Sequence, residues 1–136
     1  MKEIKNIIEL KTNSKTKQLL FKTKYLVQIN FTFELMVLSE GFSGNSQFCV
    51  RRDQLENLNI ELDNIYSRLS GSTKIEDNDS DAFIEFSIEP NGNLNIQGQV
   101  GGTYEDHFIK FKLVTDQTCI PPLIQDFSIL LLNKDK

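Results

Sequence analysis

Hydrophobic and polar residues alternate with a period of two through much of the first third of the chain. The apolar odd positions are Leu19, Phe21, Tyr25, Val27, Ile29, Phe31, Phe33, Leu35 and Val37. Alternation of this kind predicts an antiparallel strand with one buried face, and it excludes a helix. Nineteen residues exceed the usual length of a strand, so we expect a bend or bulge near Thr23 and Lys24. A shorter and less regular stretch, Ile4 to Lys11, predicts an edge strand.

The spacing changes to that of a helix after a polar loop at 39–46 and a short strand at 47–50. Apolar residues then recur every three or four positions, at Leu55, Leu58, Leu62, Ile65 and Leu69. Asp53 with Glu56 three residues later resembles a capping box. This spacing predicts an amphipathic helix over about 53–70.

Three further strands and a second helix follow an acidic connection. Alternation over 84–89, the turn sequence PNGN at 90–93 and the apolar positions of 94–100 predict a hairpin. Alternation returns at 107–113. Apolar residues at helical spacing, opened by a pair of prolines, predict the closing helix over 120–132.

This order of elements predicts an α+β fold. We expect an antiparallel sheet of about 5–6 strands, with the two amphipathic helices, about 53–70 and 120–132, packed on its apolar face. The length of 136 residues suits a single domain over 1–136, with a Lys-rich N-terminal β segment at 1–24. The two halves of the chain, each a set of strands followed by a helix, are similar in outline.

The net charge of −4 conceals an asymmetry along the chain. Residues 1–24 hold seven Lys against two Glu, a balance of +5, and the other residues have a balance of −9. The acidic part of the chain, residues 25–136, is a poor non-specific binder of nucleic acid, because the phosphates repel it. It suits a basic partner, and it is equally compatible with solubility alone.

The sequence shows no feature that points to a membrane or to an oxidising compartment. The N-terminal stretch MKEIKNIIEL carries Lys and Glu among its apolar residues and does not resemble a secretory signal peptide. No apolar run approaches the roughly 18 residues of a membrane span. The two cysteines, Cys49 and Cys119, are interpreted as reduced thiols. We therefore expect a cytoplasmic protein without membrane contact.

One acidic stretch has the alternate carboxylates that open a calcium loop. Its acidic residues are Glu76, Asp77, Asp79 and Asp81. An EF-hand also needs Gly at the sixth position and Glu at the twelfth, where this chain has Ala82 and Ile88. We therefore assign no metal site here and interpret the stretch as a solvated connection or, alternatively, as an acidic patch that contacts a partner.

The stretch LVTDQTC before the last helix gathers an acid, an amide, a hydroxyl and a thiol. Cys119, His107 and Asp116 are the residue types of a nucleophilic triad. The stretch also precedes a helix, where Asp116 or Thr118 can cap the free N–H groups. We assign a structural corner and no catalytic or cofactor-binding residue, although the helix N-terminus could also lower the pKa of Cys119 and make it reactive.

Three longer segments together resemble a known family. They read LENLNIELDNIYSRLSG, FIEFSIEPNGNLNIQGQV and FKLVTDQTCIPPLIQDFSILL. The order of strands and helices between Phe31 and Leu132 is similar to that of the WapI-like group of small bacterial immunity-type proteins. The resemblance implies a non-enzymatic cytosolic protein that binds and neutralises a cognate toxin domain. Its partner would be a protein, basic if the acidic part of the chain is the contact, with no cofactor and no nucleic acid.

Two other classes of function stay open at the level of sequence. One is a small-ligand-binding or scaffold domain with a pocket between the sheet and the helices. The other is a cysteine-dependent enzyme using Cys119. The oligomeric state is not readable, although an edge strand such as Ile4 to Leu10 could pair across a dimer.

Overall fold

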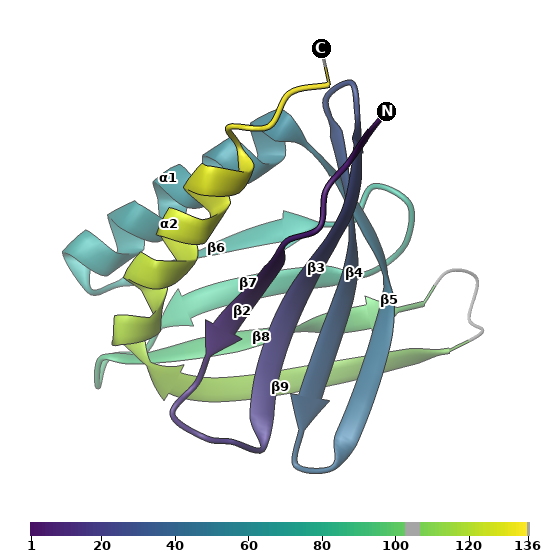
Figure 1. The fold of residues 1–136 in the computed structure, drawn as a ribbon. Coiled ribbons are helices and arrows are strands. Elements are labelled where there is room, and N and C mark those ends of the chain that lie inside the picture. The colour runs from purple at the N-terminus through teal and green to yellow at the C-terminus, as the bar shows by residue number, and fades with distance from the viewer. Residues whose placement is uncertain (103–106, 136) are drawn as a thin grey trace.

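The computed structural model describes residues 1–102 and 107–135, which form nine strands, two α-helices and one short 3₁₀ helix (Figure 1). In chain order the elements are β1 (Lys2–Glu3), β2 (Ile7–Lys11), β3 (Lys17–Val27), β4 (Asn30–Ser39), β5 (Phe42–Arg51), α1 (Arg52–Arg68), β6 (Gly71–Glu76), β7 (Phe83–Ile88), β8 (Asn93–Gly101), β9 (Phe108–Asp116), η1 (Gln117–Cys119) and α2 (Ile120–Leu130). Both predicted helices are present to within two residues at each end.

The described strands form two antiparallel sheets rather than one. Sheet A has the order β1-β3-β4-β5, with β2 also paired to β3, and sheet B has the order β6-β7-β8-β9. The strands of sheet B run steeply across those of sheet A, and both helices lie on one side of the molecule (Figure 1). The α+β class is confirmed. The single sheet of 5–6 strands is wrong, because α1 carries the chain away from β5 before the second set of strands begins.

The longest predicted strand is a hairpin of β3 and β4. Val27 pairs with Asn30, so Gln28 and Ile29 form a two-residue loop, in which Gln28 has a φ of 57°. Positive φ in a two-residue loop suits the twist of a hairpin. The predicted irregularity is confirmed as a register shift between Thr23 and Tyr25.

This bulge explains why the alternation ran through the loop without a visible break. A two-residue loop alone would pair odd-numbered residues of one strand with even-numbered residues of the other. This is the pairing between the loop and the bulge, where Leu26 faces Phe31. The extra residue of the bulge restores pairing between odd positions, as where Phe21 faces Leu35. Odd apolar residues therefore stay on the inner face along most of both strands, and a period-two pattern could not reveal the hairpin.

The predicted loop at 39–46 is mostly strand. The chain turns within two residues, Glu40 and Gly41, which have φ values of 52° and 90°. β5 then begins at Phe42. A further strand, β6, lies inside the predicted acidic connection, where Ile75 is the single large apolar residue facing the core.

One hydrophobic core joins both sheets and both helices. The ring of Phe21 in β3 meets Phe33 in β4 at a centroid distance of 5.8 Å and Phe127 in α2 at 5.3 Å, both edge to face. α1 buries Leu55, Leu58, Leu62 and Ile65, as its spacing predicted, whereas Leu69 follows the helix as its C-cap and is exposed. In the described part of the chain, no helix is long and apolar enough to cross a membrane.

Arg52 links the start of α1 to the end of α2. Its guanidinium donates hydrogen bonds to the carbonyl oxygens of Leu131, at 2.6 Å, and of Asn133, and it lies 5.2 Å from the ring centre of Phe31. A cation at these carbonyls satisfies groups that have no partner within the helix. The predicted cap of Asp53 with Glu56 is wrong, because the Gln54 side chain accepts the N–H of Arg51 instead.

Candidate protein-interaction surface

The acidic loop, residues 77–82 between β6 and β7, is anchored to the open edge of β5. The N–H of Cys49 donates to the Asp77 carboxylate at 2.9 Å, and the N–H of Asn78 donates to the carbonyl of Cys49 at 2.9 Å. One of these bonds joins main-chain atoms of Asn78 and Cys49, and the other joins the main chain of β5 to the Asp77 side chain. The loop is therefore held in place by backbone pairing as well as by side chains.

Asp77 organises this loop from within. Its side chain is 7% exposed, and its carboxylate also accepts the N–H of Asp79, at 3.1 Å, and the hydroxyl of Ser80. The other three predicted contact acids, Glu76, Asp79 and Asp81, are exposed. The structure thus gives Asp77 a structural position and leaves three carboxylates at the surface. Within the described residues, no group of three or more His, Cys, Asp or Glu is arranged to hold a metal ion.

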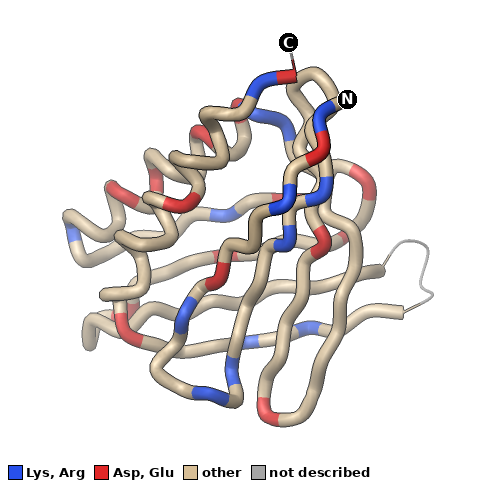
Figure 2. The backbone as a smooth tube through the Cα atoms, viewed as in Figure 1, with Lys and Arg blue, Asp and Glu red and all other residues tan. Residues whose placement is uncertain are grey.

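The acidic loop also contacts the first turn of α1. The side-chain amides of Gln54 and Asn78 exchange hydrogen bonds of 3.2 and 2.9 Å. Glu56, two residues further along α1, is exposed but lines a cleft with Arg52 and Leu131 instead. We call the exposed set Glu76, Asp79 and Asp81 the acidic surface. Figure 2 shows acidic positions along the helices and at this loop, whereas Lys residues gather on the N-terminal strands.

The cysteine and the histidine of the possible triad lie far apart. His107 is exposed just before β9, whereas Cys119 is buried beyond its other end. Nine strand residues separate them, on the order of 25 Å. Burial raises the pKa of the Cys119 thiol to about 12, and the nearby Asp116 adds to the effect. The N-terminus of α2 therefore does not bring the pKa of Cys119 below its usual value, and the sequence-based possibility of a reactive thiolate is not supported.

The stretch before α2 is a corner between β9 and the helix. The Asp116 carboxylate accepts the N–H of Thr118 at 2.9 Å and so caps η1. Thr118 contributes its backbone donor to this bond. α2 then starts after Cys119, with the prolines in its first turn.

Cys49 has its side chain on the outer face of sheet A, beside Thr32, whose hydroxyl lies 3.9 Å from the sulfur. Burial raises the pKa of the Cys49 thiol, the Thr32 hydrogen bond lowers it, and the negative charges of Asp79 and Asp77 raise it. The hydrogen bond from the N–H of Cys49 to the Asp77 carboxylate places the acidic loop at the margin of this face.

A groove of about 420 Å³ lies on the same outer face of sheet A, further along β5. Its floor follows the sheet register, in which Leu20 faces Met36 and Met36 faces Asn45. Its lining residues are Gln18, Leu20, Met36, Val37, Leu38, Ser43, Gly44 and Asn45. None of them is charged. Figure 1 is viewed from this face, and neither helix lies over it in the described part of the chain.

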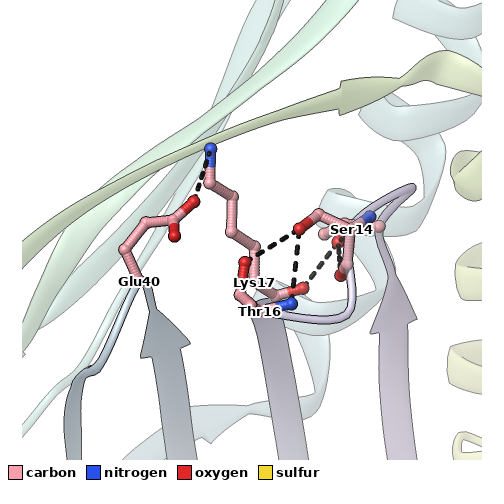
Figure 3. Close-up of polar contacts among 5 residues, drawn as sticks. Ser14, Thr16, Lys17 and Glu40 are labelled. Atoms are coloured by element: carbon pink, nitrogen blue, oxygen red, sulfur yellow. Dashed lines mark hydrogen bonds and ion pairs between the residues drawn. The ribbon is translucent and has the colours of Figure 1, made fainter.

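Hydrogen bonds between two turns fix the end of sheet A next to the groove (Figure 3). The N–H of Glu40 donates to the carbonyl of Thr16 at 3.0 Å, and the Lys17 ammonium lies 3.7 Å from the Glu40 carboxylate. Ser14 and Thr16 hydroxyls lie 3.0 Å apart. These contacts join the two hairpin ends side by side. Sequence patterns could not predict the groove, because its lining residues come from three different strands.

The predicted pocket between sheet and helices is filled where α2 packs on sheet A. The rings of Phe21, Phe33 and Phe127 occupy that space. A cleft of about 560 Å³ opens at the surface, between the β3–β4 loop and the C-terminal segment after α2. Its lining residues are Gln28, Ile29, Arg52, Glu56, Leu131, Lys134 and Asp135.

The fold and these surfaces define an α+β protein with two antiparallel sheets and a candidate site for protein contact. A model of the WapI-like immunity protein family matches residues 25–132. This match covers most of the chain, so the chain belongs to the WapI-like immunity protein family, as its sequence resemblance indicated.

Two further comparisons bear on the fold. A solved structure described as crystal structures of Trypanosoma bruciei MRP1/MRP2 is similar with a TM-score of 0.55 and 7% sequence identity, covering 94% of this chain and 84% of that one. At this identity the likeness concerns the fold alone. No curated protein sequence matches the chain at a significant level.

Proposed function

We propose that this protein is an immunity protein that binds the domain of a cognate toxin and neutralises it by occupying its surface. The observation that carries the proposal is the family match over residues 25–132. The protein acts by binding and not by catalysis, since the candidate triad is dispersed and its thiol is buried. Binding takes place in the cytoplasm, where both cysteines remain reduced.

The acidic surface is the part of the molecule best suited to contact a basic toxin domain. Asp79 and Asp81 are exposed carboxylates on the acidic loop, and Glu76 is exposed at the end of β6 just before it. Complementary charge accelerates association and selects the partner more than it raises affinity. A basic active-site surface covered by these carboxylates would be closed to its substrate.

The rigidity of the acidic loop supports the same role. Asp77 holds the loop through three hydrogen bonds, and the backbone of Asn78 pairs with Cys49. A loop that is already ordered loses little conformational freedom on binding, so more of the interaction energy appears as affinity.

The first step is to identify a toxin gene adjacent to the gene of this protein, and the test then uses the domain that it encodes. The wild-type chain should suppress the toxicity of that domain in cells and bind it in solution. The triple variant Glu76→Lys, Asp79→Lys and Asp81→Lys should bind at least about tenfold more weakly, with slower association and a weaker dependence on salt.

A matched control separates the acidic surface from net charge. The triple variant Glu61→Lys, Asp63→Lys and Asp126→Lys makes the same change in charge on the two helices, outside the acidic surface, and it should weaken binding by less than about threefold. A wild-type chain that neither binds the domain nor suppresses it contradicts the proposed function. Equal losses in the two triple variants contradict the assignment to the acidic surface.

A further inference from the structure

We infer that the outer face of sheet A is a second part of the toxin-binding surface, and that its groove receives an apolar anchor side chain of the toxin domain. This inference rests on the proposed function and names where most of the binding energy arises. The groove residues that carry it are Leu20, Met36 and Leu38.

These three side chains face away from the core. They occupy even positions of β3 and β4 and are half-buried, whereas Leu19, Leu35 and other odd neighbours are fully buried on the inner face. Two of them sit directly opposite each other across the strands. Adjacent large apolar residues on the outward face of a sheet mark a contact site rather than a requirement of folding.

The outer face of sheet B provides the contrast. Its middle row, across the four strands, reads Lys74, Glu85, Gln97 and Lys112. The Gln97 amide donates to the Glu85 carboxylate at 2.9 Å. This middle row is polar on sheet B, where the apolar outer residues Phe83, Phe108 and Val114 lie outside it, whereas Leu20 and Met36 are adjacent in one row of sheet A.

The rim of the groove fits a neutral side chain. Gln18, Ser43 and Asn45 supply amides and a hydroxyl around the apolar floor. An uncharged anchor can bury its apolar surface there while the neighbouring backbone bonds to the rim, the arrangement found at energetic centres of protein interfaces. A charged side chain would lose its hydration without gaining a counter-charge.

Continuity with the acidic loop identifies the occupant as the same basic partner. Asn45 at the groove and Cys49 at the loop lie four residues apart on β5, about 13 Å. A standard interface covers about 800 Å² on each partner, roughly 30 Å across, so one contact spans both features. At the β2 margin of the groove, Lys11 pairs with the rim residue Gln18, and Lys22 lies two residues from Leu20 on β3; both repel a basic domain. The contact therefore extends from the groove toward β5 and the acidic loop.

The experiment measures binding of the same toxin domain to the double variant Met36→Gln and Leu38→Asn. Both substitutions keep a similar length at outward-facing positions, and they should leave the unfolding midpoint close to that of the wild type. Affinity should fall about 30-fold, mainly through faster dissociation, with an unchanged dependence on salt. The matched control is Val114→Asn, a half-buried apolar residue on the outer face of sheet B, which should not change affinity.

Each other outcome overturns the inference in a recognisable way. If the double variant binds like the wild type while the acidic triple variant binds weakly, the groove is not part of the contact and the proposed function stands. If the wild type sediments as a dimer that the double variant converts to a monomer, the face belongs to a second copy of this chain. If the wild type fails to bind the domain, the proposed function is contradicted, and the inference that rests on it is contradicted with it.

Discussion

Replacing Arg52 with alanine should destabilise the protein strongly, although Arg52 lies outside the proposed contact. The change removes two guanidinium hydrogen bonds to the carbonyls of Leu131 and Asn133 and the contact with the ring of Phe31. Hydrogen bonds to a charged group contribute about 1.5–3 kcal/mol each, and the contact with an aromatic ring about 0.5–1 kcal/mol. Because Arg52 is only partly buried and the contributions are not additive, we expect a loss of about 2–4 kcal/mol.

The measurement is the free energy of unfolding in urea, followed by circular dichroism, with a thermal midpoint about 10 °C below the wild type. Arg52→Lys keeps the charge at the end of α2 without the planar fork, so it should recover roughly half of the loss. Arg51→Ala is the matched control, because the Arg51 side chain forms an exposed ion pair with Asp53 that contributes little. Equal stability of Arg52→Ala and Arg51→Ala would refute the reasoning.

Three further predictions concern the core, the loop and the thiol. Gly98→Ala should lower stability by more than about 2 kcal/mol in the same urea assay, because its new Cβ would lie 2.1 Å from the carbonyl oxygen of Phe83. Asp77→Ala should lose about 1–3 kcal/mol through the donors that it leaves unpaired, while Asp81→Ala stays near the wild type. Cys119 has a pKa raised from 9.0 to about 12, so it should resist alkylation in the folded protein at pH 8. Its contribution to stability should be complete below pH 9 and decline as the pH rises toward 12, which titration of wild type against Cys119→Ala checks.

Local patterns predicted most elements, because each depends on a few neighbouring residues. The helical spacing of Leu55, Leu58 and Leu62 indicates α1 whatever lies opposite it. The alternation over 84–89 likewise indicates β7. The number of sheets is a property of distant pairings, so alternation alone could not give it.

The missed beginning of β5 has a specific physical cause. Gly44 lies on the inner side, where an added Cβ would come within 2.7 Å of the Ile109 side chain. A glycine in a polar stretch reads as a loop, whereas here it allows close approach of a residue from β9. The need for glycine at position 44 is explained only by β9, which lies far along the chain.

The candidate site was visible from the sequence only in part. The acidic stretch stood out by composition, but the inward position of Asp77 depends on the open edge of β5 at Cys49. The role of Arg52 depends on where α2 ends. The groove on sheet A depends on the hairpin that places Leu20 opposite Met36, which the continuous alternation concealed.

Titration of the purified neighbouring toxin domain into this protein, at several salt concentrations, is the decisive experiment for its role as an immunity protein. We expect one-to-one binding in the nanomolar range at low salt that weakens steadily as salt increases, with loss of toxin activity at equimolar ratio. The acidic triple variant should lose most of the salt dependence, and the groove variant should retain it. Binding weaker than about 10 µM, or a toxin that stays active in the complex, would contradict the assignment.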